Sequence, residues 1–430
     1  MPFEYLTAAA RRVAVIGAGI SGLAAAHLLA GEAAVVLYEA EARMGGHART
    51  VMAGKRGDQP VDTGFIVFNK VNYPHLLGLF EKLAVPIADS NMSFGASIRG
   101  GWLEYGLNNL NALFTQRRNI ASPGYLRMLR DIVHFNARAE GAVAPGMVIS
   151  DLLDVLGTGR WFRDYYITPI SGAIWSTPVD GILDFPAETL IRFFKNHALM
   201  SITNQRQWFT VQGGSVEYVR RLEAHLARQG VDLRPSTPIA GVRRTTDGVL
   251  VRAVGAEWEL FDEVIFATHS DDTLRLLADA RPSERAALGA VRYQPNQAVL
   301  HADASQMPRS PRAWASWVYS EPAGPGPDRI DLTYWMNSLQ PIPKDDPLFV
   351  TLNPNRPIHP GLIHDVVTFR HPVFDRAALA AQGAIRAMNG ADNTWFCGAW
   401  TRHGFHEDGF ASAVAVVKAM QARAALRLAA

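Results

Sequence analysis

Hydrophobic and polar residues alternate in blocks along the chain, and the first block already shows two different patterns. Val13–Ala30 is a run of eighteen residues without a charge. RRVAVIG is a β-branched run typical of a short strand, and SGLAAAHLLAG is an alanine-rich helix pattern that ends at Gly31. A membrane span needs about 20 apolar residues, but the internal glycines, Ser21 and His27 argue against one. The block therefore predicts a strand, a turn and a helix.

Strand and helix patterns return later in the chain. AAVVLYEA, which ends in Glu39 and Ala40, predicts a second strand. Residues 208–287 alternate a helix with several strands joined by glycine-containing turns. Near the C-terminal end, a strand over residues 394–397 leads into a long helix that we expect to start at Asp408 or Gly409. This alternation predicts an α/β fold.

Three glycines lie where the first strand meets the first helix, in the spacing Gly17-x-Gly19-x-x-Gly22. The first permits a tight turn, the second lets the backbone approach a pyrophosphate, and the third lets the helix pack on the strand. Glu39 lies close to the offset of about 20 residues at which a carboxylate accepts hydrogen bonds from a ribose. These residues predict a dinucleotide site that suits NAD or FAD.

The next segment, EARMGGHART, favours FAD. Arg43, the paired glycines Gly45 and Gly46, and Thr50 predict a second backbone loop that wraps the far side of a long FAD molecule; an ordinary Gly-Gly turn is the alternative. A C-terminal helix that starts near Asp408 would aim free N–H groups and its positive dipole end at the ligand. Such groups favour the reduced flavin, which carries negative charge after hydride arrives at N5.

With these motifs, the sequence resembles the FAD-dependent amine oxidase and phytoene desaturase superfamily, which also contains protoporphyrinogen oxidase and polyunsaturated fatty-acid isomerases. The resemblance covers most of the chain and includes the glycine fingerprint, RMGGHART, VDTGFIVFN, VQGGSVEYVRRL and FDEVIFATHSDDTLRLL. More narrowly, IWSTP, FPAETLIRFFKNHAL, TYWMNSLQ, TFRHPVF and GFHEDG resemble one bacterial branch, similar to the flavoprotein desaturase of methyl-branched and furan fatty-acid biosynthesis.

The resemblance implies a discontinuous Rossmann-like FAD-binding domain, of the glutathione-reductase and amine-oxidase type, with a second α+β substrate domain. Residues 1–89, 208–287 and 376–430 would form the first domain, and residues 90–207 and 288–375 the second. Non-covalent FAD binding is implied for a set of residues from the three flavin segments: Gly17, Gly19, Ile20, Ser21, Gly22, Glu39, Ala40, Arg43, Gly45, Gly46, His47, Thr63, Gly64, Phe65, Val242, Gly398, Asp408, Gly409 and Phe410.

Two positions depart from the superfamily pattern. His47 stands where most members have a second arginine after the paired glycines, so this chain lacks that arginine contact to the phosphate. Ala399 stands where an acidic residue usually follows the glycine near the ribityl chain, so backbone groups or water would hold the ribityl hydroxyls. Cys397 precedes that glycine, where the resemblance implies no covalent flavin attachment.

The substrate domain is rich in aromatic residues. Its tryptophans are Trp102, Trp161, Trp175, Trp314, Trp317 and Trp335, with Trp208 at its edge. LTYWMN alternates as a strand, which predicts Tyr334 and Met336 on one face and Trp335 and Asn337 on the other. Core packing accounts for most single aromatic residues, but their concentration in the lobe that faces the flavin predicts a long apolar tunnel.

Four residues are candidates for catalysis: His403, His406, His197 and Asn337. Desaturation of a hydrocarbon chain removes a hydride and a proton, and an imidazole suits the proton. Histidines with purely structural partners are the alternative. The spacing of His403 and His406 offers no third distant ligand, so we expect no metal.

Composition restricts the class of protein further. The 430 residues are 48% hydrophobic and 19% charged, which suffices for two lobes, and a net charge of +2 gives no nucleic-acid footprint. Cys397 is the one cysteine, so no internal disulfide forms.

MPFEYLTAAARR lacks the order of a secretory signal, so we expect a cytoplasmic protein. FTQRRNIASPGYLRMLRDIVHF mixes arginines with apolar residues, which predicts either peripheral contact with the inner face of the membrane or a solvated helix face.

Together these features predict a FAD-dependent oxidoreductase that desaturates a long, methyl-branched or unsaturated fatty acyl chain, free, on a carrier or in a phospholipid, by hydride transfer to flavin N5. A fatty-acid double-bond isomerase, a flavin amine oxidase and a non-catalytic flavin- and lipid-binding subunit are the alternatives. An amine oxidase would place two aromatic rings beside the flavin, for which Trp400 and Phe405 are available, and a lysine near N5 that the sequence does not locate. The sequence predicts neither the electron acceptor nor the oligomeric state.

Overall fold

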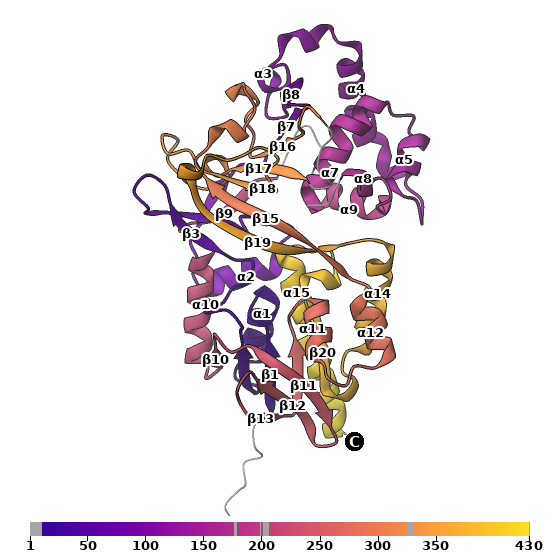
Figure 1. The fold of residues 1–430 in the computed structure, drawn as a ribbon. Coiled ribbons are helices and arrows are strands. Elements are labelled where there is room, and N and C mark those ends of the chain that lie inside the picture. The colour runs from indigo at the N-terminus through magenta and orange to yellow at the C-terminus, as the bar shows by residue number, and fades with distance from the viewer. Residues whose placement is uncertain (1–10, 176–178, 198, 201–205, 325–329, 430) are drawn as a thin grey trace, which may run out of the picture.

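The computed structural model describes residues 11–175, 179–197, 199–200, 206–324 and 330–429 (Figure 1). Residues 1–10, which carry the prediction about the secretory signal, lie outside this part, as do residues 176–178 of IWSTP and residue 198. The described chain forms two bodies stacked end to end, with the C-terminus at the far end of the lower one (Figure 1).

A five-stranded parallel sheet forms the centre of the lower body. Its strand order is β10-β2-β1-β14-β20, built from β1 (Arg12–Ile16), β2 (Ala34–Tyr38), β10 (Asp232–Arg234), β14 (Glu263–Phe266) and β20 (Thr394–Phe396). Val13 and Val15 pack into one apolar cluster, and Ala14 and Ile16 into another on the opposite face. Because both faces are covered, these strands are continuous apolar runs in the sequence.

Helices cover one face of this sheet: α1 (Ile20–Leu29), α2 (Pro74–Lys82), α10 (Val216–Arg228) and α15 (His406–Ala429). The other face carries an antiparallel sheet of β11 (Ile239–Thr245), β12 (Gly248–Ala253) and β13 (Trp258–Phe261), together with α11 (Ser270–Leu276), α12 (Pro282–Gly289) and α14 (Arg376–Met388). The predicted α/β class is confirmed. The last helix starts earlier than we expected, at His406, because the Asp408 carboxylate accepts the N–H of Phe405 from within the first turn.

The upper body contains a seven-stranded mixed sheet in the order β19-β15-β18-β17-β16-β7-β8. Its strands are β7 (Phe94–Ile98), β8 (Leu103–Gly106), β15 (Arg292–His301), β16 (Trp317–Ser320), β17 (Asp331–Trp335), β18 (Phe349–Leu352) and β19 (Ile363–Val373). Helices pack beside it: α3 (Leu110–Leu113), α4 (Pro123–Ala142), α5 (Ile149–Val155), α6 (Arg160–Phe162), α7 (Thr168–Trp175), α8 (Val179–Ile182) and α9 (Ala187–Asn196). The long strands β15 and β19 run across the boundary between the two bodies (Figure 1).

The predicted alternation after Tyr334 is wrong beyond Trp335. β17 ends there, and Met336–Leu339 form the short helix α13. Asn337 therefore leaves the strand. Its amide donates to the carbonyls of Pro343 and Asp346, and its oxygen accepts the N–H of Leu348.

Two small sheets connect the bodies: β3 (Thr50–Ala53) with β4 (Gln59–Asp62), and β5 (Val67–Asn69) with β9 (Trp208–Val211) and β6 (Ile87–Ser90). The buried Asp62 carboxylate accepts hydrogen bonds from Thr50, from the backbone and side chain of Ser215, and from Gln340. It thus ties three distant segments together beside the site. The predicted domain boundaries stay a prediction.

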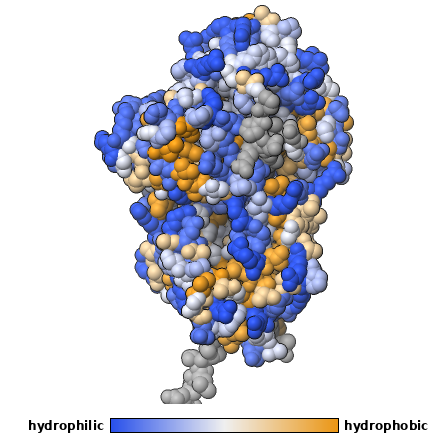
Figure 2. Space-filling model, viewed as in Figure 1, coloured by the Kyte–Doolittle hydropathy of each residue, from blue (hydrophilic) through white to orange (hydrophobic). Residues whose placement is uncertain are grey.

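The arginine-rich segment forms α4 and the turn before it. Met128 is buried in the upper core, and Arg127 and Arg130 contact the buried Asp131, whereas Leu126 and Val133 are exposed. In Figure 2 the end of the molecule that carries α3 and α4 is mostly hydrophilic on the side shown. Among the described helices, none is long and apolar enough to cross a bilayer.

Candidate functional site

The glycine fingerprint forms a cradle at the start of α1. Gly17 has a φ of +96°, which disfavours other residues, and a Cβ at Gly22 would lie 1.8 Å from the Gly17 carbonyl oxygen. A Cβ at Gly19 would meet nothing within 4 Å, so this backbone borders open space. The fingerprint thus packs helix on strand tightly and leaves room above the helix N-terminus, as a dinucleotide requires.

The second glycine loop lies directly against the first. The N–H of Gly45 donates to the Ala18 carbonyl at 2.8 Å, and a Cβ at Gly46 would lie 3.0 Å from the Cα of Gly19. Arg43 donates to carbonyl groups of its own loop, so it braces the loop rather than reaching into the cradle. The predicted two-loop clamp is present, held by backbone contacts.

Glu39 lies under the same cradle. One carboxylate oxygen accepts the N–H of Ala18 at 2.7 Å, and the other accepts a backbone N–H of the following turn. Its main chain accepts the N–H of Thr237, so the loop before β11 is the neighbour of Glu39. Val242, which the resemblance implied as a FAD contact, does not line the cavity; its side chain lies in the core and its carbonyl accepts the N–H of Ala278.

A cavity of about 400 Å³ opens from this cradle and takes lining residues from both bodies. Of the predicted flavin residues, those that line it are Gly19, Ile20, Ser21, Gly45, His47, Thr63, Gly64, Phe65 and Gly398. Others belong to the two loops and the strand end that build the cradle: Gly17, Gly22, Glu39, Arg43 and Gly46, with Ala40 next to Glu39 in the chain. These residues fit FAD: the cradle suits the diphosphate and the cavity suits the ring.

The first turn of α15 supports the cradle from the other side. A Cβ at Gly409 would lie 2.7 Å from the Ile20 side chain, so the N-terminal turns of α1 and α15 are in close contact. The side chains of Asp408 and Phe410 do not line the cavity; Asp408 caps the helix, and Phe410 is buried in the core. What this turn offers a flavin is backbone N–H groups.

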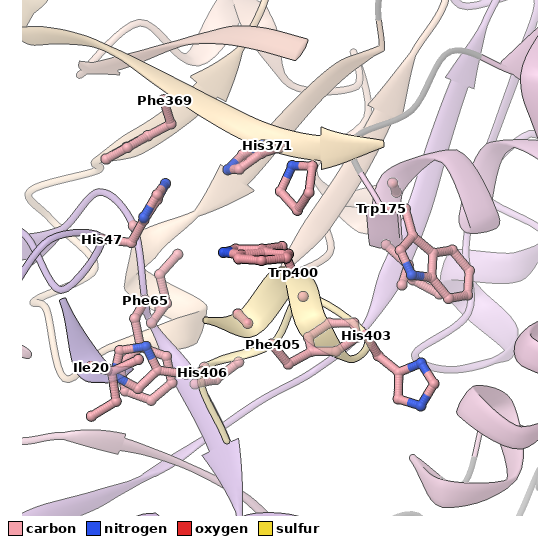
Figure 3. A pocket seen from close by; sticks show the side chains of 18 of the residues that line it. Ile20, His47, Phe65, Trp175, Phe369, His371, Trp400, His403, Phe405 and His406 are labelled. Atoms are coloured by element: carbon pink, nitrogen blue, oxygen red, sulfur yellow. The ribbon is translucent and has the colours of Figure 1, made fainter. Parts of the chain in front are cut away.

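Six histidines line the cavity: His47, His197, His269, His371, His403 and His406. Burial lowers the pKa of each, to about 3 for His371 and His406 and to about 4 for the others. All six are therefore neutral near pH 7. Figure 3 places His406 beside Phe65 and Ile20 at one end of the cavity and His403 beyond Phe405 at the other.

Two of these imidazoles have side-chain hydrogen-bond partners. The hydroxyl of Tyr218 and Nε2 of His406 share a hydrogen bond of 2.7 Å, in which either group can be the donor. The side-chain N–H of Asn296 donates to Nδ1 of His371 at 2.8 Å, so His371 carries its hydrogen on Nε2. His371 can therefore donate a hydrogen bond from Nε2, whereas the role of His406 as acceptor of the substrate proton stays a prediction.

His197 has the opposite arrangement. Its Nδ1 donates to the carbonyl of Phe193 at 2.9 Å, which leaves Nε2 with a lone pair. A neutral imidazole with a free lone pair, on the wall of an apolar cavity, can accept a proton. Asn337 does not line the cavity, and the loop contacts of its amide give it a structural role instead of the predicted catalytic one.

The sequence interpretation missed residues from two strands. Ala267, Thr268 and His269 follow β14, the neighbour of β1, and line the cavity. Ligands bind at the carboxyl ends of such parallel strands, and that rule could have identified them. Arg370 and His371 come from β19, whose approach the sequence does not signal. Within the described residues, the group His269, Asp271 and Asp272 could hold a metal ion, but Arg370 pairs with both carboxylates.

The wall of the cavity is largely apolar and aromatic. None of the described residues that line it is an aspartate, a glutamate or a lysine. Trp175, Trp208, Trp317 and Trp400 line it, and Trp400 donates its indole N–H to the carbonyl of Thr268. The other tryptophans of the predicted tunnel, Trp102, Trp161, Trp314 and Trp335, pack elsewhere.

A dinucleotide cradle that opens onto a largely apolar cavity between two bodies defines a flavin-dependent oxidoreductase. The family comparison gives the same class: the model described as "Flavin containing amine oxidoreductase" matches residues 20–302 of the 430. The chain belongs to this family, which implies FAD as its cofactor.

Solved structures share the fold at low sequence identity. A redesigned putrescine oxidase is 15% identical, with a TM-score of 0.68, and the alignment covers 96% of this chain and 99% of that one. A fatty acid isomerase from P. acnes is 16% identical, with a TM-score of 0.66 and coverage of 95% and 98%. Cyclohexylamine oxidase from Brevibacterium oxydans IH-35A is 15% identical, with a TM-score of 0.66 and coverage of 96% and 100%. A comparison with curated protein sequences finds no match.

Proposed function

We propose that the protein desaturates a long, methyl-branched or unsaturated fatty acyl chain by hydride transfer to non-covalently bound FAD. The observation that carries this proposal is the cavity wall: aromatic and aliphatic side chains make up most of it, beside six neutral histidines and Arg370, and it holds no carboxylate or lysine among its described residues. Transfer of an apolar acyl chain from water into a cavity with such a wall is favourable. The bound chain also keeps water away from the reacting carbon.

In the proposed reaction, different groups around the cavity accept the hydride and the proton. FAD supplies the hydride acceptor at N5. His197 accepts the proton that leaves the neighbouring carbon, because its Nε2 has a free lone pair. The N–H of His371, and that of His406 if Tyr218 is the donor of their shared hydrogen bond, stabilises negative charge that develops during the reaction. Cys397 is buried in the core and does not line the cavity, which supports non-covalent binding.

The amine oxidase alternative has less support. Trp400 and Phe405 both line the cavity, but no described lysine does, and no described carboxylate is present to attract a substrate ammonium group. The fatty acid isomerase of similar fold supports an acyl substrate and keeps double-bond isomerisation as the competing reaction on the same chain.

Lipid profiling of cells with and without the protein tests the proposal. We expect one acyl species to be replaced by a product that has lost two hydrogen atoms. A product of unchanged mass with a moved double bond would establish the isomerase instead. An unchanged lipid profile, with an amine consumed, would overturn the acyl proposal.

A further inference from the structure

A second, smaller cavity of about 220 Å³ adjoins the main one. The two share a wall, to which Phe193 and Phe405 contribute; their rings stack with centroids 4.8 Å apart. His197 and His403 also line both cavities. We call the smaller one the side cavity. It lies where the apolar wall of the main cavity gives way to polar residues.

The side cavity has cationic groups that the fold itself leaves unpaired. Arg192, an exposed residue of α9, lines it, and Arg402 stands next to His403 in the chain. Burial, followed by the charges of Arg192 and Arg402, lowers the pKa of His403. Arg192 lines the side cavity, whereas Arg402 borders it through its neighbour His403. Within the described part of the chain, neither guanidinium has a hydrogen-bond or ion-pair partner.

Two carboxylates also line the side cavity, but the fold already uses them. Glu407 accepts the backbone N–H groups of His75 and Leu76 at the start of α2 and pairs with the His75 ring. Asp408 accepts the N–H of Phe405 within the first turn of α15. Both are engaged as helix caps, and neither forms an ion pair with Arg192 or Arg402. Burial raises the pKa of Asp408 to about 6, and the charge of Arg402 opposes this rise, so Arg402 is partly balanced by Asp408 whereas Arg192 is not.

We propose that the side cavity binds the anionic head of the substrate, a carboxylate or a phosphate, through Arg192 and Arg402, while the acyl chain passes Phe193 and Phe405 into the main cavity. This inference builds on the proposed function and makes its substrate an anionic lipid. Arginine matches both head groups because its planar guanidinium donates two parallel hydrogen bonds. The structure supports the assignment because the unpaired charge lies outside the apolar wall and next to it.

Binding of named probes to the purified FAD-loaded protein tests the site. The probes are oleate, its neutral methyl ester and lysophosphatidylglycerol, and the flavin visible spectrum reports occupancy. We expect oleate, lysophosphatidylglycerol or both to bind at least about tenfold more tightly than the ester. The preferred anion then identifies the source of the head group. Arg192→Gln and Arg402→Gln should each weaken the preferred anion by about tenfold and leave the ester unchanged.

Arg228→Gln is the matched control, because Arg228 is an exposed arginine at the end of α10, in the lower body. It should bind all three probes as the wild type does. The proposal is overturned if the ester binds as tightly as the anions, or if both substitutions leave anion affinity unchanged. Loss of ester binding in the variants would also overturn it, since that indicates a collapsed cavity wall. Flavin reduction by lipid is scored separately, so failure of desaturation and failure of the head-group site give different results.

Discussion

The histidines that line the cavity can act as hydrogen-bond donors or as proton acceptors, depending on which group binds the other ring nitrogen. Asn296 donates to Nδ1 of His371 and leaves that ring with an N–H at Nε2, and we propose that Tyr218 donates to His406 in the same way. The carbonyl of Phe193 accepts from His197 and leaves a lone pair. Burial then keeps these rings neutral.

His197→Gln tests the proton acceptor. We expect the rate of flavin reduction by the substrate to fall at least about 100-fold, because glutamine cannot take the proton, while flavin content stays unchanged. Rapid-mixing absorbance measures this rate. His364→Gln, at an exposed position of β19, should leave the rate unchanged. Equal rates in the two variants would assign the proton to another group.

The pH dependence of the wild type gives a second test of His197. Burial lowers its pKa to about 4, so the ring stays unprotonated and active down to that range. The rate of flavin reduction should therefore be flat between about pH 6 and 8 and fall below about pH 5. A decline centred near the ordinary histidine pKa of about 6.5 would contradict the buried, neutral ring.

Tyr218→Phe tests the N–H donor. We propose that Tyr218 donates to Nε2 of His406; without the hydroxyl, the ring hydrogen can move from Nδ1 to Nε2. We expect a shifted visible spectrum of the bound flavin and a rate of flavin reduction lower by about tenfold. Tyr105→Phe is the matched control, because this buried hydroxyl bonds the Tyr165 carbonyl in the upper body. The same spectral shift in both variants would refute the specific role of Tyr218.

At the scale of elements, the strands, turns and helices that form from local sequence patterns were predictable, but the side chains that distant segments bring to the cavity were not. The strand, the glycine turn and α1 follow from local pattern, and so does the second loop around Gly45. The side-chain environment does not: Asn337 sits in a helix after a strand that stops early, and the β19 residues reach the site through long-range sheet pairing. The tautomer of a histidine depends on a hydrogen-bond partner that can be distant in sequence, as Asn296 is from His371.

The packing of α1 on β1 is testable with two glycines. In Gly22→Ala the new Cβ would lie 1.8 Å from the Gly17 carbonyl oxygen, so we expect destabilisation by about 2 kcal/mol or more and loss of bound flavin. In Gly383→Ala, within α14, the new Cβ meets nothing within 4 Å, so a gain of about 0.5–1 kcal/mol is expected. Thermal unfolding and the flavin-to-protein ratio measure both. Retained flavin in Gly22→Ala would contradict the cradle geometry.

At the scale of the molecule, the arginine-rich end of the upper body is a proposed contact with anionic membranes. Leu126 and Val133 are exposed on α4, close in sequence to several arginines. We expect co-sedimentation with phosphatidylglycerol vesicles that is lost at high salt and weakened in L126Q/V133Q. Val254→Gln, an exposed apolar residue of the lower body, is the control. Binding that is absent, or insensitive to salt and to both α4 substitutions, would exclude this surface.

The central proposal concerns both bodies: FAD bound by the lower body accepts a hydride from an acyl chain bound against the upper body. Anaerobic mixing of the FAD-loaded protein with methyl-branched and unsaturated acyl lipids tests it most directly. We predict that an acyl lipid bleaches the flavin absorbance in a single turnover, with one dehydrogenated product formed for each flavin reduced. A flavin that keeps its colour with every such lipid, but bleaches with a simple amine, would contradict the account.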